Sequence, residues 1–197
     1  KPVKTLPMAD CELRDEQFRN IERLRKECDE KGIPVFSIDT KKKELLGNFR
    51  RDNGSAYTTE AVEVSDHDYS TFSNGKMVPH GIYDIRKNTG YMTFGLSHDT
   101  AEFACDCLAE QWEQHLRYIY PNAKNILVLC DGGGSNSARS WQFKWYLIET
   151  AKRLGINIRI AHYPPYCSKW NPIEHRLFSQ ISRVWSGAVF NTVEEAR

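Results

Sequence analysis

The sequence lacks the features that would place it in a membrane, in a disulfide scaffold or in a strong electrostatic field. No run approaches the roughly 18 apolar residues of a membrane-spanning helix, and no signal peptide opens the chain, so we expect neither a membrane nor an exported protein. The six cysteines form no C-x-x-C pair, and their spacing predicts no zinc site. With 27 basic and 26 acidic residues the formal net charge is only +1, so a polyanion must be bound by a local patch.

What is present is enough for one globular domain. The 197 residues, 40% hydrophobic and 12% aromatic, can bury a single core, and we expect residues 1–197 to form one domain. Cys130 lies within an apolar run, where a free thiol packs as a small hydrophobe, and this indicates a reducing compartment. The chain starts at Lys1 and not at Met, so we expect a fragment of a longer protein.

The stretch from Ile126 to Asp131 is the clearest strand. Five apolar residues followed by Asp131 and three glycines are typical of a strand buried on both faces of a sheet. Such a strand places Asp131 at the carboxyl edge, where open α/β sheets bind ligands. Two alternatives stay open. The glycines can belong to a dinucleotide fingerprint, although Ser137 stands where the third glycine should be, or Asp131 can simply begin a turn.

Apolar periodicity predicts the other elements. Further strands are expected at residues 33–39, 80–86, 91–97 and 156–163, the second and third forming a hairpin. Helices are expected at residues 11–30, from Asp99 to the residue before Pro121, from Ser137 or Asn136 to Gly155, and from Asn171 to about Trp185. Residues 50–79 are polar and rich in turn residues, so we expect a long surface connection that includes a short hairpin.

Two of these helices have predicted caps and faces. Asp99 with Glu102 three residues later is typical of a capping box, which explains Asp99 without catalysis. The helix after Ser137 is expected to bury one side, made of Trp141, Trp145, Ile148 and Ala151.

Glu174 occupies an unusual position on the last helix. It stands three residues after the predicted cap Asn171, so a capping box is one interpretation. On a helical wheel of about 100° per residue with Ile173 at zero, however, Glu174 falls near 100°, within an apolar arc from Val184 near 20° to Phe178 near 140°. A carboxylate that faces the sheet is costly unless it binds a cation or a donor. We therefore favour a functional role for Glu174.

The element order is that of the ribonuclease H-like fold, an α/β fold with a mixed five-stranded sheet flanked by helices. Asp39, Asp131 and Glu174 fall on the elements where that fold keeps its metal site. The sequence resembles the DDE transposases of bacterial insertion sequences, within the ribonuclease H-like integrase superfamily. Nearly the whole chain takes part, through Asp-Thr-Lys-Lys-Lys-Glu-Leu at 39–45, His-Asp-Thr-Ala-Glu-Phe at 98–103, Asp-Gly-Gly-Gly-Ser-Asn at 131–136 and Ser-Lys-Trp-Asn-x-Ile-Glu-His-Arg-Leu-Phe at 168–178.

The resemblance implies that Asp39, Asp131 and Glu174 are the catalytic triad and that they bind two Mg²⁺ ions, for which Mn²⁺ can substitute. Hard carboxylate oxygens suit Mg²⁺, and two ions about 3.5–4 Å apart can assist displacement at a phosphodiester. The expected reaction is cleavage at the ends of the element and joining of the 3′-hydroxyl to target DNA. The helix-turn-helix region that such transposases usually carry is absent from residues 1–197.

The same resemblance predicts partners and a location. DNA, both terminal repeats and target, is the expected partner, bound by a homodimer or larger synaptic oligomer in the bacterial cytoplasm. Candidate DNA contacts are Lys41, Lys42, Lys43, Lys169, Trp170, His175 and Arg176. For the lysine run a solvated strand end is an equally good explanation, and Trp170 can instead be a hydrophobic staple that packs on His175.

Two other functions remain open at this point. A ribonuclease H-like nuclease or resolvase would hydrolyse DNA without joining it. A non-catalytic DNA- or nucleotide-binding domain would use the same carboxylates only as caps and turn residues.

Overall fold

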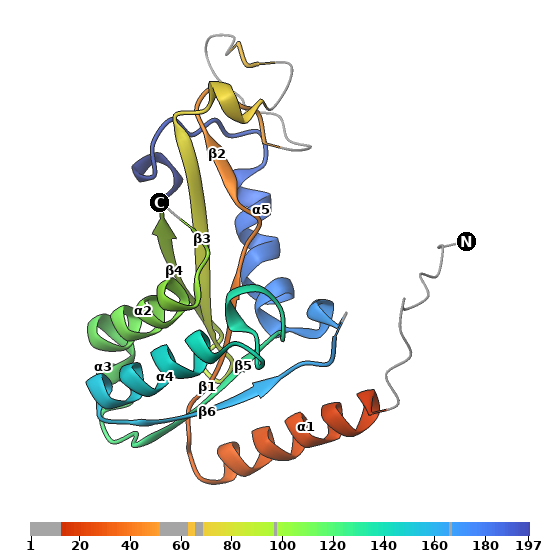
Figure 1. Cartoon of the computed structure of the whole chain (residues 1–197), viewed down its shortest axis with the longest axis vertical. Coiled ribbons are helices and arrows are strands. Elements are labelled where there is room, and N and C mark those ends of the chain that lie inside the picture. The colour runs from red at the N-terminus through yellow and green to blue at the C-terminus, as the bar shows by residue number, and fades with distance from the viewer. Residues whose placement is uncertain (1–12, 52–62, 66–68, 97, 166) are drawn as a thin grey trace.

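The computed structural model describes residues 13–51, 63–65, 69–96, 98–165 and 167–197, and these form one mixed sheet with helices on both faces (Figure 1). The six strands are β1 (Val35–Thr40), β2 (Glu44–Leu46), β3 (Gly75–Asp84), β4 (Thr89–Gly95), β5 (Asn125–Cys130) and β6 (Asn157–His162). Strand β3 is antiparallel to β1, β2 and β4, whereas β1, β5 and β6 run parallel. The predicted hairpin and the predicted strands at residues 126–131 and 156–163 are confirmed.

Strands β1 and β2 pair with consecutive parts of β3. Residues 36–40 of β1 pair with residues 84–80, and residues 44–46 of β2 pair with residues 77–75. Both therefore lie along one side of β3, and β4 lies along the other. The sheet keeps five lateral positions, as the predicted fold class requires, although it contains six strands.

The helices are α1 (Arg14–Glu30), α2 (Ala101–Gln111), α3 (Arg117–Ile119), α4 (Trp141–Leu154) and α5 (Ser179–Trp185). Single π-helical turns, η2 (Trp112–Leu116) and η5 (Glu174–Phe178), adjoin α2 and α5. Short 3₁₀ turns lie at η1 (Ser70–Phe72), η3 (Gly134–Asn136), η4 (Ser168–Trp170) and η6 (Glu194–Ala196). Figure 1 shows α2, α3 and α4 on one side of the sheet and α1 and α5 on the other. No helix among the described residues is long and apolar enough to cross a membrane.

Strand β5 is buried on both faces, as its apolar run predicts. Ile126, Val128 and Cys130 pack in the core beneath α2 and η2. Leu127 and Leu129 pack on the opposite face, beneath α1. Because β5 lies between β1 and β6, it is held laterally on both sides as well. Asp131 therefore follows a strand that is covered on both faces and paired on both edges.

The prediction of a connection over residues 50–79 is wrong at its end, because β3 begins at Gly75. Residues 77–84 are all buried and show no alternation, and Pro79 interrupts the apolar pattern. The carbonyl of Pro79 accepts a hydrogen bond from the amide of Lys41, which lies between the end of β1 and the start of β2. The nitrogen of Pro79, which has no hydrogen, faces the same edge of the strand. Proline is tolerated in this strand because no regular ladder continues at that point. The segments 52–62 and 66–68 lie outside the described residues.

The predicted buried side of α4 is wrong. Trp141 and Trp145 are 82% and 62% exposed, while Phe143 and Thr150 are buried. The helix has two apolar stripes, and Phe143 packs with Ala101 and Cys105 of α2. Periodicity alone does not tell which of two such stripes meets the neighbouring helix.

Two predicted caps also differ. Thr100, and not Asp99, caps α2 by accepting a hydrogen bond from the amide of Phe103. Ser140, and not Ser137 or Asn136, caps α4. Asp99 instead accepts a hydrogen bond of 3.2 Å from the hydroxyl of Thr40, at the end of β1. The capping interpretation therefore does not account for Asp99.

The wheel of the last helix holds only as far as its π-helical turn. A π turn contains one more residue than an α turn, which rotates everything after it by about 100°. Val184, predicted within the apolar arc, is 76% exposed, whereas Trp185 is buried. The prediction for Val184 is wrong for this reason, and Phe178, inside the π turn, is buried as predicted.

Candidate active site

Asp39 lies near the end of β1, in the middle of the sheet. Its side chain is buried, and its Oδ1 accepts a hydrogen bond of 2.8 Å from the amide of Thr40. Burial raises the pKa of Asp39 to about 7, and the negative charges of Asp131 and Glu174 add to this rise. A carboxylate in such surroundings gains from a nearby cation.

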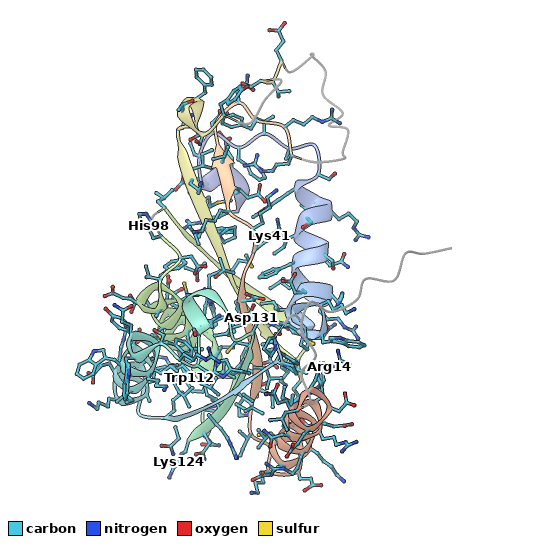
Figure 2. All side chains as sticks on the ribbon, turned by 45° about the vertical axis from the view of Figure 1, so that its right-hand side comes forward. Arg14, Lys41, His98, Trp112, Lys124 and Asp131 are labelled. Carbon is cyan, nitrogen blue, oxygen red and sulfur yellow. The ribbon has the colours of Figure 1, made fainter. Side chains whose placement is uncertain are left out.

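Asp131 lies beside Asp39 because β1 and β5 are parallel neighbours. The register pairs Ser37 with Leu129, so the two strands reach Asp39 and Asp131 at the same level of the sheet. The amide of Gly133 donates a hydrogen bond of 3.3 Å to Asp131. Burial raises the pKa of Asp131 above its usual range. Figure 2 shows Asp131 near the middle of the molecule.

Glu174 reaches the same edge from the π-helical turn η5. Two glycines let this turn approach the sheet closely. A Cβ on Gly81 would come within 2.6 Å of Phe178, and one on Gly90 within 2.4 Å of Leu177. Burial raises the pKa of Glu174; Asp131 adds to the rise, while His175, a hydrogen bond with Asp39 and Lys41 lower it. The three acidic residues thus act on one another electrostatically, although they come from three separate elements.

Two further residues act on Asp131, and sequence analysis did not assign either of them to this site. His162, at the end of β6, pairs with Cys130 in the sheet and lowers the pKa of Asp131. Its Nε2 lies 2.8 Å from the carbonyl oxygen of Asn136, which ties down the glycine-rich loop. Asp99 also acts on Asp131 and raises its pKa. His162 ends an ordinary strand pattern, so no sequence signal distinguished it.

The donor chemistry of this site fits a divalent cation. Asp39 is buried, Asp131 and Glu174 are half-buried, and all three have raised pKa values, so these carboxyl groups are oxygen ligands whose ionised form Mg²⁺ or Mn²⁺ would stabilise. Within the described residues, no three His, Cys, Asp or Glu side chains converge closely enough to hold one ion together.

A basic groove of about 710 Å³ begins at Glu174 and runs between β2 and α5. Its lining includes Lys41, Lys42 and Lys43 on one side and Ser179 and Ser182 on the other. Lys42 and Lys43 are exposed. Lys41 differs from them, because its ammonium forms a 2.9 Å ion pair with Glu44 and lies 5.1 Å from the ring centre of Trp185.

The other four predicted DNA contacts lie away from this groove. Lys169 and Trp170 are exposed on η4, where the Trp170 ring packs edge-on against Phe18 of α1 at 6.1 Å. His175 is hydrogen-bonded to the carbonyl of Lys169, and with Arg176 it lines a separate cavity of about 490 Å³. The partner of Trp170 in a packing role is thus Phe18, and the predicted staple on His175 is not seen.

Asn171 is the residue whose role sequence analysis misjudged most. Its predicted role was a helix cap, but its side chain is fully buried and points to β1. The amide nitrogen donates to Asp39, and the amide oxygen accepts from Ser37. The Asn-Pro pair is a good helix-start signal, and it concealed this contact.

Comparison with known proteins shows the same architecture. A family model described as the Rhodopirellula transposase DDE domain matches residues 1–196. A Mos1 transposase paired-end complex with left transposon end matches with a TM-score of 0.62 at 16% identity, over 98% of this chain and 55% of that chain. Mos1 paired-end complexes solved with Mn and with Mg match with TM-scores of 0.58 and 0.61 at 16% and 15% identity, over the same shares.

At such identities the structural matches show the fold, which is that of ribonuclease H-like transposase domains. The chain spans about half the length of these solved structures. A search of curated proteins found no match.

Proposed function

The chain belongs to the family of the Rhodopirellula transposase DDE domain, and on that basis we propose that it cleaves DNA at the ends of a mobile element and joins the freed 3′-hydroxyl to target DNA. Family membership makes this a transposase catalytic domain. The joining reaction, the three catalytic residues and the metal are the proposal. A nuclease that only hydrolyses DNA is the alternative that uses the same site.

The observation that carries the proposal is the electrostatic coupling of three acidic residues from separate elements. Asp39 and Asp131 end neighbouring parallel strands, and Glu174 approaches from a helix that is packed onto two glycines. All three have raised pKa values, and each is influenced by at least one other acidic residue. Holding these acidic groups together lowers the stability of the folded protein, and such an arrangement is typical of functional sites.

We propose that Asp39, Asp131 and Glu174 would hold two divalent cations. When bound, such ions activate the attacking hydroxyl and stabilise the leaving oxyanion. The Mos1 complexes solved with Mn and with Mg support the choice of metal. Burial makes ionisation of Asp39 costly, so its carboxyl group keeps a proton to higher pH than usual. As pH rises, a cation can take the place of that proton.

The protein's own contribution to the reaction is placement of the DNA. The groove between β2 and α5 brings lysine ammonium groups and serine hydroxyls to the side of Glu174. Ammonium groups neutralise phosphates, and hydroxyls donate hydrogen bonds to them, without selecting a sequence. We propose that the DNA backbone follows this groove into the acidic site. Lys169, Trp170, His175 and Arg176 would contact DNA farther along its path.

Lys42→Ala and Lys43→Ala should each weaken DNA binding with little change in stability. Each lost phosphate contact should reduce the slope of log affinity against log salt by about 0.9 for duplex DNA. Lys124→Ala is the matched control, because this exposed lysine lies at the lower end of the molecule, whereas Lys41 lies near its middle, above Asp131 (Figure 2). Lys41→Ala should mainly lower thermal stability, since Lys41 is paired with Glu44. Equal slopes for the Lys42 and Lys124 variants would remove the groove from the DNA path.

The reaction is tested by incubating the protein with pre-nicked element ends and a plasmid target in Mn²⁺. Joined product is the expected result. Cleavage without joined product would favour the nuclease alternative, and absence of both would favour a non-catalytic DNA-binding domain. We further propose that two or more copies act together on paired ends, because the Mos1 matches are paired-end complexes. Native mass spectrometry of the protein with two end duplexes measures this directly.

A further inference from the structure

The side-chain amide of Asn171 joins the two elements that carry Asp39 and Glu174. Asn171 is 0% exposed. Its Nδ2 donates hydrogen bonds of 3.4 Å to the carbonyl oxygen of Ile38 and to Oδ2 of Asp39. Its own backbone carbonyl accepts a hydrogen bond of 3.1 Å from the amide of Glu174. One residue thus contacts the carboxylate of the first element and the backbone of the second.

Ser37 completes this buried network. It lies two residues before Asp39 and therefore on the same face of β1. Its hydroxyl donates to Oδ1 of Asn171 and accepts a hydrogen bond of 3.2 Å from the amide of Ile173. Ile173 is the residue directly before Glu174 and is itself fully buried. The start of the Glu174 turn is consequently fixed to β1 by side-chain hydrogen bonds as well as by apolar packing.

The orientation of the amide follows from the groups around it. A backbone carbonyl only accepts hydrogen bonds, so the NH₂ group must face the carbonyl of Ile38 and therefore also Oδ2 of Asp39 beside it. The hydroxyl of Ser37 accepts from Ile173, and its single proton is directed at Oδ1. The reverse orientation would place Oδ1 against the oxygens of Asp39 and Ile38. No other orientation satisfies every group in this enclosed space.

We propose that Asn171 is a positioning residue that holds Asp39 and Glu174 in place for metal binding. This inference rests on the proposed function, since it concerns the same acidic site. The acidic residues repel one another when no cation is bound. The amide counters that repulsion by donating to Asp39 while Ser37 anchors the turn of Glu174. A metal then meets ligands that are already oriented, which is how hydrogen-bonded neighbours strengthen metal sites.

The test is Mn²⁺ affinity, measured by titration calorimetry on the whole 197-residue chain. Asn171→Ala and the bulkier Asn171→Leu should each weaken Mn²⁺ binding about 10–100-fold. Gln111→Ala is the control, because it also removes a buried amide, one that donates 3.0 Å to Thr93 away from the acidic residues. Gln111→Ala should change Mn²⁺ affinity by less than about twofold, even if it lowers the melting temperature as much as the Asn171 variants do.

A double variant adds a second criterion. Ser37→Ala should weaken Mn²⁺ binding by a smaller factor, and Ser37→Ala with Asn171→Ala should be no worse than Asn171→Ala alone, because the two side chains act through one network. Fully multiplicative losses would contradict a shared network. The single variant Ser37→Ala, which leaves Asn171 in place, keeps the test available if Asn171→Ala does not fold.

Failure of the inference is distinguishable from failure of the proposed function. Asp39→Ala should abolish Mn²⁺ binding; if it does not, the metal site itself is wrong. If Asp39→Ala abolishes binding while both Asn171 variants bind Mn²⁺ as the wild type does, the positioning role is overturned and the proposed function stands.

Discussion

Replacing Asp39, Asp131 or Glu174 with alanine is expected to lower the rate of DNA joining by on the order of 10³-fold or more. In the proposed site each substitution would remove an oxygen ligand that the metal needs, so a double variant should be little worse than a single one. The rate is measured with pre-nicked ends under single-turnover conditions.

The control for these variants is their stability. Because the three acidic residues repel one another without metal, none of the substitutions should lower the melting temperature of the metal-free protein by removing charge. Glu113→Ala, which breaks an exposed ion pair with Arg153, provides a matched loss of one carboxylate elsewhere. A variant of Asp39, Asp131 or Glu174 that joins DNA at the wild-type rate would exclude that residue from the triad.

Asp39→Asn should stabilise the metal-free protein at neutral pH. The pKa of Asp39 is about 7 in the folded state, because burial and two nearby acidic residues disfavour the ionised form, whereas an unfolded chain has an Asp pKa of about 3.9. The folded state therefore binds more protons between these two pH values, and the free energy of unfolding falls as pH rises through this window. The variant should exceed the wild type by roughly 1–4 kcal/mol at pH 8 and by little near pH 4.

Chemical denaturation in a chelating buffer at several pH values measures this difference. Adding Mg²⁺ at pH 8 should raise the stability of the wild type more than that of Asp39→Asn, since a cation takes the place of the proton. If the difference in unfolding free energy between the variant and the wild type stays constant between pH 4 and 8, Asp39 titrates normally.

The elements that could be predicted from the sequence are those fixed by local chemistry. The apolar run of β5 and the turn residues between β3 and β4 each have one physical interpretation, and both elements are confirmed. The placement of Asp39, Asp131 and Glu174 followed from strand ends and a helical wheel. Their assignment as catalytic residues remains a proposal.

The features that were missed depend on contacts between distant residues. No local pattern shows that Asn171 turns away from its helix to reach β1, because its partners lie more than 130 positions away. The π-helical turn η5 rotates the face of the last helix by about 100°, and Leu177 and Phe178 of this turn pack on Gly90 and Gly81 of distant strands. The exposed face of α4 was misassigned because two stripes were equally apolar, and only the neighbour α2 selects between them.

The central claim is that Asp39, Asp131 and Glu174 form a divalent-metal site. Crystals of the protein soaked in Mn²⁺, with anomalous diffraction recorded at the manganese edge, test it most directly. We expect anomalous density in contact with the carboxylate of Asp39 together with that of Asp131, Glu174 or both. Bound Mn²⁺ that contacts none of these three carboxylates, in crystals where the site is open to solvent, would contradict it.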